Sequence, residues 1–146
     1  MEVTKTLLEA GAVVDHADNQ GYTALLLATW KGQLEVTKTL LEAGAVVDHA
    51  NNYGTTALLL AAQFGHVEVT KTLLEAGAVV DHADNEGRTA LCLAAQLGRV
   101  EVIKVLLEAG GDLNHKAKNG LTPLAIARLK NQEAAALALV QAGATE

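Results

Sequence analysis

The sequence repeats itself at an interval of 33 residues along nearly its whole length. The clearest copy is a block of 16 residues, Glu-Val-Thr-Lys-Thr-Leu-Leu-Glu-Ala-Gly-Ala-Val-Val-Asp-His-Ala, which occurs unchanged at 2–17, 35–50 and 68–83. Self-similarity at a fixed period of this size is typical of arrays in which each repeat packs only against its neighbours. We therefore expect the chain to fold as a stack of similar units.

The period divides the chain into units of one domain, which we expect to span residues 1–146. Full units run over 18–50, 51–83 and 84–116, with a half unit (1–17) before them and a shortened unit (117–146) behind. The half unit supplies a second helix without its partner first helix, so an apolar flank is left uncovered. Such a flank can drive self-association, and it gives the chain the look of an engineered array or an excerpt of a longer one.

Each unit begins with a turn and a short apolar helix. In the unit that starts at Asp18, the segment Asp-Asn-Gln-Gly favours a turn, because glycine tolerates positive φ and Asp or Asn can bond its own backbone. Thr23 then suits a helix N-cap, and Gly32 suits a left-handed helix stop. The pattern predicts a first helix over 24–31, apolar almost all round and sandwiched between neighbours.

The second helix is predicted to have one wet face and one buried face. Charged residues share the wet face through three- and four-residue spacing, and they are Glu35, Lys38 and Glu42. Apolar residues line the other face, namely Val36, Leu40 and Ala43. A glutamate follows four residues after each of Lys5, Lys38, Lys71 and Lys104. Helices this short are marginal alone, so we expect their stability to come from packing between units.

Every 33 residues the chain contains a turn with Gly-x-Thr-x-Leu, a helix, a glycine, a second helix and Leu-Leu-x-x-Gly-Ala-x-Val. This repeated unit closely resembles the ankyrin repeat. The resemblance covers virtually the whole chain and implies an all-α solenoid of stacked helix-turn-helix units with hairpin-like fingers. Ankyrin repeats usually carry Thr-Pro-Leu-His at the first helix, whereas here only Pro123 restores the proline. In place of the polar link that this histidine provides in the family, we expect apolar packing of Leu26, Leu59 and Cys92.

The first two full units agree at 25 of 33 positions, and their differences fall mainly in the turn and at the end of the first helix. In ankyrin proteins these positions form the concave surface that grips partners. The only aromatic residues of the chain occupy them, namely Tyr22, Trp30, Tyr53 and Phe64. Tyr and Trp are enriched in binding hot spots. We predict the partner-binding set Gln20, Tyr22, Trp30, Lys31, Tyr53, Thr55, Gln63, Phe64, Glu86, Arg88, Gln96 and Leu97.

The resemblance implies a protein–protein interaction module that uses this surface. An alternative is an engineered or consensus-like structural scaffold with no natural partner, which the identity of the repeated blocks favours. At the level of single residues, Trp30 and Phe64 have a second interpretation as fillers of gaps between neighbouring first helices. A second interpretation of the differences between units is drift after duplication, although drift should also have changed the helix over 35–42, which is identical in the two units.

Several kinds of chemistry lack support in the sequence. Histidines recur at 33-residue spacing, at His16, His49, His82 and His115. Neighbouring helices lie roughly 8 to 10 Å apart, too far for side chains of different units to share one metal ion. We therefore expect the histidines to form a ladder of hydrogen bonds between turns, and Asp15, Asp48 and Asp81 beside them to be structural. Neither a metal site nor a cofactor is predicted.

The remaining composition limits partners and location. Phosphate-binding and zinc-hydrolase motifs are absent, and Cys92 has no activating base near it in sequence, so we expect no enzyme. A net charge of −6 without a basic patch argues against nucleic acid, and no apolar run is long enough for a membrane span. A lone cysteine cannot form an internal disulfide, which favours a cytoplasmic location.

Overall fold

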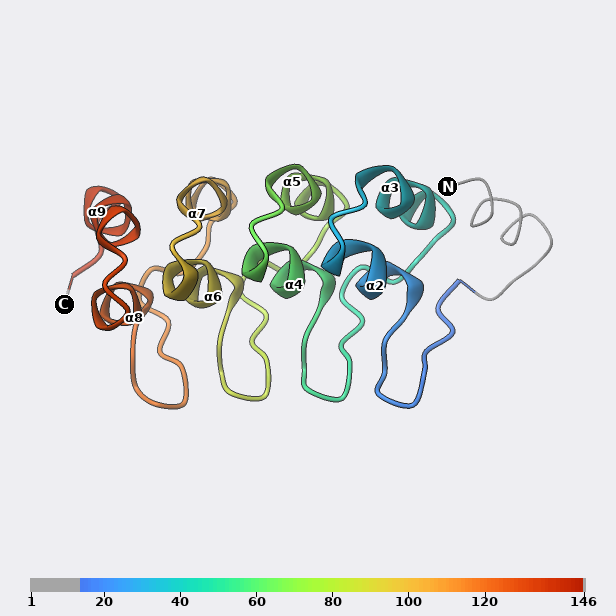
Figure 1. Ribbon diagram of the computed structural model, residues 1–146, viewed down its shortest axis with the longest axis horizontal. Helices are drawn as coiled ribbons and strands as arrows, with labels where there is room; N and C mark the ends of the chain where they lie inside the picture. Colours follow the sequence, from blue (N-terminus) through green and yellow to red (C-terminus); the bar gives the residue numbers. More distant parts are fainter. Residues whose placement is uncertain (1–13, 146) are drawn as a thin grey trace.

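The computed structural model describes residues 14–145, and this part of the chain consists of helices joined by turns and loops (Figure 1). Eight helices are present in it: α2 (Ala24–Trp30), α3 (Leu34–Glu42), α4 (Ala57–Gln63), α5 (Val67–Glu75), α6 (Ala90–Leu97), α7 (Val100–Glu108), α8 (Pro123–Leu129) and α9 (Glu133–Gln141). The all-α stack expected from the repeat is confirmed. None of these helices is long and apolar enough to cross a membrane.

The helices form two layers, with α2, α4, α6 and α8 in one and α3, α5, α7 and α9 in the other (Figure 1). Each first helix packs on the second helix of its own unit and on the first helices of its neighbours. Long loops project from the first-helix layer, and we call them finger loops; they comprise residues 14–23, 43–56, 76–89 and 109–122. The stack thus places finger loops and first helices side by side along one face.

A threonine begins every first helix, as predicted for Thr23. Its side-chain oxygen accepts a hydrogen bond from the backbone N–H of Leu26, and Thr56, Thr89 and Thr122 make the same bond. An N-cap of this kind stabilises a helix by about 1 kcal/mol. Helix α2 ends at Trp30, one residue earlier than predicted, because Lys31 is the C-cap before the left-handed Gly32.

The buried face of the second helix differs from the prediction at one residue. Leu40 is buried and Val36 is half-buried, but Ala43 is exposed because the helix ends at Glu42 and Ala43 is its C-cap. Thr37 is fully buried instead. Its hydroxyl donates to a backbone carbonyl one turn earlier at 2.8 Å, so the polar group is satisfied inside the helix.

The lysines of the second helices pair with the glutamate three residues before them, and not with the one four residues after. The pairs are Lys38–Glu35 (3.9 Å), Lys71–Glu68 (3.4 Å) and Lys104–Glu101 (3.4 Å). All are well exposed, so each contributes only a few tenths of a kcal/mol, as estimated for such surface pairs. Lys5 lies outside the described residues.

The core runs through the stack between the first helices. Leu26, Leu59 and Cys92 are each 1% exposed, and the predicted apolar packing is confirmed for Leu26 and Leu59, while Cys92 Sγ also accepts a hydrogen bond from the Thr89 hydroxyl at 3.4 Å. Helix α2 differs from α4 and α6 on one flank, because Leu27 is 42% exposed whereas its equivalent Leu60 is 7% exposed. The predicted half unit covers residues 1–17, and its residues 1–13 lie outside the described part of the chain, as does most of the surface that we expect to favour self-association.

Hydrogen bonds tie each finger loop to the next. A histidine ring donates to a glycine carbonyl of the preceding loop in three pairs: His49 to Gly21 (2.9 Å), His82 to Gly54 (3.2 Å) and His115 to Gly87 (2.8 Å). The predicted ladder is confirmed for these histidines, while His16 is exposed. Three aspartates accept backbone N–H bonds from the following loop at 2.9 to 3.0 Å, and they are Asp15, Asp48 and Asp81. Their predicted structural role is also confirmed.

Candidate functional site

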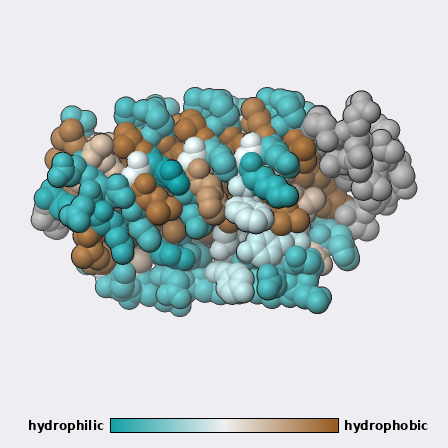
Figure 2. Space-filling view, viewed as in Figure 1, coloured by the Kyte–Doolittle hydropathy of each residue, from teal (hydrophilic) through white to brown (hydrophobic). Residues whose placement is uncertain are grey.

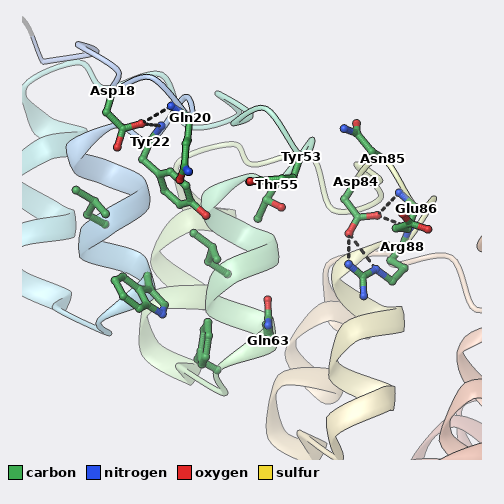
Figure 3. A pocket seen from close by; sticks show the side chains of 14 residues that line it. Asp18, Gln20, Tyr22, Tyr53, Thr55, Gln63, Asp84, Asn85, Glu86 and Arg88 are labelled. Carbon is green, nitrogen blue, oxygen red and sulfur yellow. Dashed lines mark hydrogen bonds and ion pairs between the residues drawn. The ribbon is translucent and has the colours of Figure 1, made fainter.

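A groove of about 670 Å³ opens between the finger loops and the first helices of the first three full units (Figure 3). Nine of the twelve predicted binding residues line it, and these are Gln20, Tyr22, Trp30, Tyr53, Thr55, Gln63, Phe64, Glu86 and Arg88. Five further residues complete the lining, namely Asp18, Leu27, Leu60, Asp84 and Asn85. The fold therefore gathers most of the variable positions around one hollow.

A second groove of about 340 Å³ continues along the same face toward α8. Glu86 and Arg88 line both grooves, so the two are continuous. Gln96 lines the second groove, whereas the remaining predicted residues, Lys31 and Leu97, line neither and are exposed beside them. We refer to the two hollows together as the concave groove.

The aromatic side chains of the groove face solvent to different degrees. Trp30, Tyr53 and Phe64 are 46%, 57% and 39% exposed, so they do not fill gaps in the core. Tyr22 is half-buried and packs against the core. Within residues 14–145 the one stacked ring contact joins Phe64 and His66, with centroids 6.3 Å apart. Trp30 and Tyr53 therefore present the most open aromatic surface to another molecule, while Phe64 stacks on His66 and keeps 39% of its surface exposed.

Among the five lining residues that the sequence analysis did not predict, Leu27 and Leu60 are the apolar ones. Both belong to the apolar run of the first helix and are identical between units, so a search for variable positions could not find them. Their helical spacing was the available signal, since each lies one turn before a variable residue, Trp30 or Phe64. They add an apolar floor beneath the aromatic side chains.

The ends of the first helices are held by a second ladder of side chains, which the sequence did not reveal. Each bond runs from a side chain of one unit to a backbone carbonyl of the unit before: His66 to Trp30 (3.0 Å), Arg99 to Gln63 (3.1 Å) and Gln132 to Gln96 (3.2 Å). Because the three donors are residues of different types, the sequence alone does not show that they make equivalent hydrogen bonds. The carbonyls belong to groove positions, so this ladder makes the groove rigid.

An ion pair fixes the centre of the groove. Asp84 is almost buried, and the Arg88 side chain folds back onto it, with both Nε and Nη2 3.0 Å from the same carboxylate oxygen (Figure 3). The other carboxylate oxygen accepts the backbone N–H groups of Glu86 and Arg88 at 2.9 and 3.0 Å. Arg88 therefore presents a held, partly exposed guanidinium edge to any bound molecule.

Asn51 occupies the same place one unit earlier but lacks the cation. Its side-chain oxygen accepts the N–H groups of Tyr53 and Thr55, as Asp84 does in its own loop. Its amide nitrogen is buried and, among the described residues, is the one buried side-chain polar atom without a hydrogen-bond partner. Leaving a buried donor unpaired costs about 1 to 3 kcal/mol.

We predict that the arrangement of the third full unit can be transplanted into the second. Asn51→Asp alone should destabilise the fold by about 1 kcal/mol or more, because it buries a carboxylate without a cation. Adding Thr55→Arg should recover this loss, with a coupling free energy of at least about 1 kcal/mol in urea unfolding. The reverse cycle, Asp84→Asn with Arg88→Thr, is the matched control. Additive effects in both cycles would show that the Asp84–Arg88 pair does not stabilise its loop.

The groove offers aromatic, amide, carboxylate and guanidinium groups on a fixed frame. Across residues 14–145 no three His, Cys, Asp or Glu side chains are grouped so that they could hold a metal ion, and Cys92 is buried. The groups present are suited to contact a surface or a peptide through packing and hydrogen bonds.

Comparison with known families gives matches to ankyrin repeats over residues 47–117, 80–145 and 1–41. The chain belongs to the ankyrin-repeat family. Ankyrin repeats are generally protein–protein interaction modules and typically have no enzymatic activity. A comparison with curated proteins gave no match. Family membership thus agrees with a binding surface on the face where this chain carries its groove.

Proposed function

We propose that this ankyrin-repeat chain is a non-enzymatic cytoplasmic module that binds a partner protein through the concave groove. The observation that carries the proposal is the presence of three solvent-exposed aromatic side chains, Trp30, Tyr53 and Phe64, around one hollow. These are the chain's only aromatic residues apart from Tyr22, which lines the same hollow. Their concentration on one face is difficult to explain by folding alone.

The energetics of the groove support binding. Burial of an exposed aromatic side chain at the centre of an interface contributes about 2 kcal/mol or more. The ladder from His66, Arg99 and Gln132 already orders the ends of the first helices. A partner therefore pays little entropy for ordering this surface, which leaves more of the contact energy as affinity.

The rival function is a structural array without a partner, which the copied 16-residue blocks favour. In such an array the aromatic residues would be incidental, and their removal would change nothing outside the chain. The two functions therefore differ in a measurable way, because only a binding module has partners that depend on the groove.

The test is a variant in which each groove aromatic becomes the residue found at the same position of a neighbouring unit. The substitutions are Tyr22→Thr, Trp30→Gln, Tyr53→Gln and Phe64→Lys, after Thr55, Gln63, Gln20 and Lys31. We call this the groove variant. Because the fold already accommodates these residues, the groove variant should remain folded.

A matched control changes exposed apolar residues away from the groove. Val46→Asp and Val79→Asp fit this purpose, because the two valines are 53% and 54% exposed, line neither part of the groove, and are replaced by Asp112 in the third full unit. In affinity capture with quantitative mass spectrometry, we expect partners of the intact chain to be lost by the groove variant and kept by the control. Identical sets of captured proteins for all three chains would favour the structural array.

A further inference from the structure

The ends of the four first helices carry an apolar stripe, with one large side chain from each unit. It consists of Trp30, Phe64, Leu97 and Leu129, which are 46%, 39%, 39% and 64% exposed. Each is the last residue of its helix or the C-cap next to it. The neighbouring position in each unit is polar instead, namely Lys31, Gln63, Gln96 and Lys130. Trp30 and Leu129 occupy one repeat position and Phe64 and Leu97 the next one, so the stripe places one apolar contact on each unit, shifted by one residue between its ends and its middle.

Pale and brown side chains cross the middle of the face seen in Figure 2, with teal side chains above and below them. The apolar band follows the long axis of the stack, along which the first helices α2, α4, α6 and α8 succeed one another (Figure 1). A partner that uses every member of the stripe must thus lie along the stack and not across it.

The spacing of the stripe selects the conformation of such a partner. Packed helices lie about 8 to 10 Å apart, so successive contacts recur at that interval. In an α-helix, residues seven apart lie on one face and about 10.5 Å apart along the axis. In a β-strand the same distance spans about three residues, and residues three apart point to opposite faces. A helix can therefore offer one side chain to each unit, and a strand cannot.

The backbone of the finger loops is also closed to strand addition. Each loop donates a backbone N–H to a carbonyl of the loop before it: Asn52 to Gln20 (2.9 Å), Asn85 to Tyr53 (3.0 Å) and Lys118 to Glu86 (3.0 Å). The side-chain amides of Asn52 and Asn85 bind the carbonyls of Asn19 and Asn52 at 3.0 Å. An extended peptide would find few free backbone groups here, whereas a helix satisfies its own.

Charge marks both ends of the stripe. Lys31 follows Trp30 and Lys130 follows Leu129, and both lysines are exposed. In the described part of the chain neither takes part in an ion pair, unlike the lysines of the second helices. A partner with acidic residues at both ends would complement these cations, which stand out on a chain of net charge −6.

We propose that the partner segment is an amphipathic α-helix that lies along the apolar stripe, with acidic residues over Lys31 and Lys130. Four contacts at seven-residue spacing need a helix of about 22 residues, whose length of about 32 Å is close to three intervals of about 8 to 10 Å. Its apolar residues recur at helical spacing and contact Trp30, Phe64, Leu97 and Leu129 in turn. This assignment rests on the proposed function and specifies which class of protein segment the groove takes.

The test uses synthetic peptides and the only tryptophan of the chain, Trp30, as a reporter inside the site. The first peptide, about 22 residues long and free of tryptophan, places leucines on one helical face and glutamates at both ends. Three control peptides have the same length: one with the leucines redistributed around the helix, one with two central prolines, and one with lysines in place of the glutamates. Each is titrated into the intact chain while Trp30 emission is recorded.

We expect saturable binding of the first peptide with a blue shift of Trp30 emission, and at least about 10-fold weaker binding of each control peptide. Leu97→Lys introduces the residue found at the equivalent positions of the first and last units, Lys31 and Lys130. This substitution should weaken binding of the first peptide by a similar factor. The double variant Lys31→Glu, Lys130→Glu should reverse the preference between glutamate and lysine peptides. The control Val46→Asp, Val79→Asp should bind as the intact chain does.

Equal binding of the redistributed or proline-containing peptide would overturn the helical assignment, as would a charge preference that the lysine variants leave unchanged. Failure of all four peptides to bind would overturn it as well. These outcomes are distinct from failure of the proposed function. If captured partners are lost by the groove variant, the groove binds protein even when no helical peptide binds to it.

Discussion

The variant Ala95→Arg is expected to lose more than about 4 kcal/mol of unfolding free energy. Ala95 lies in α6 and is 0% exposed, as are its equivalents Ala62 and Thr29 in the two preceding units. In α8 the equivalent residue is Arg128, which is exposed. The position therefore faces the following unit, and a long charged side chain fits it only where no unit follows in the described structure.

The size of this effect comes from two sources. A guanidinium at Ala95 would have to leave water without a counterion, and it would force apart helices that now pack over small side chains. Urea unfolding followed by far-UV circular dichroism measures the loss. Arg128→Ala is the matched control and should change stability by less than about 1 kcal/mol, because that side chain is at the surface. A similar small loss for Ala95→Arg would mean that the units are packed far more loosely than the structure shows.

The second large effect is expected at Gly54, which lies between the groove residues Tyr53 and Thr55. A Cβ added there would lie 2.9 Å from the backbone nitrogen of Asn85 and 3.1 Å from the Cα of Asp84, both in the next finger loop. Gly54 also has a φ of +77°, which costs an L-residue about 1 to 2 kcal/mol. Gly54→Ala should therefore strain its own loop and push the adjacent loop away.

Gly77 supplies a matched control for the backbone term alone. Its φ is +93°, and an added Cβ would meet nothing within 4 Å. We expect Gly54→Ala to cost at least about 2 kcal/mol more than Gly77→Ala in urea unfolding, because only the first requires backbone atoms to move. Equal costs for the two variants would show that the close approach of neighbouring finger loops does not limit stability.

The sequence predicted those features that depend on period and local chemistry. The repeat, the threonine N-caps and the histidine ladder follow from residues that recur at fixed positions, so one unit explains the others. The gathering of Trp30, Tyr53 and Phe64 around one hollow also agreed with the placement of variable positions.

Other features depend on contacts between units that a pattern does not contain. The side chains of His66, Arg99 and Gln132 have one role but three chemistries, so no repeated letter marks them. Ala43 was misplaced because the end of the helix, and not its apolar period, decides its exposure. The sequence does not predict the unpaired amide nitrogen of Asn51. Its side-chain oxygen accepts the same loop hydrogen bonds that an aspartate would accept, and only the second polar atom of the side chain lacks a partner.

Partner binding through the groove is tested by the affinity of a captured partner for the intact chain and for the groove variant, measured by isothermal titration calorimetry. Loss of aromatic contacts at the centre of an interface is worth about 2 kcal/mol or more, which corresponds to at least about 30-fold in Kd. We expect a loss of this size for the groove variant and no change for Val46→Asp, Val79→Asp. A groove variant that binds with the affinity of the intact chain would show that the partner does not bind through the aromatic residues of the groove.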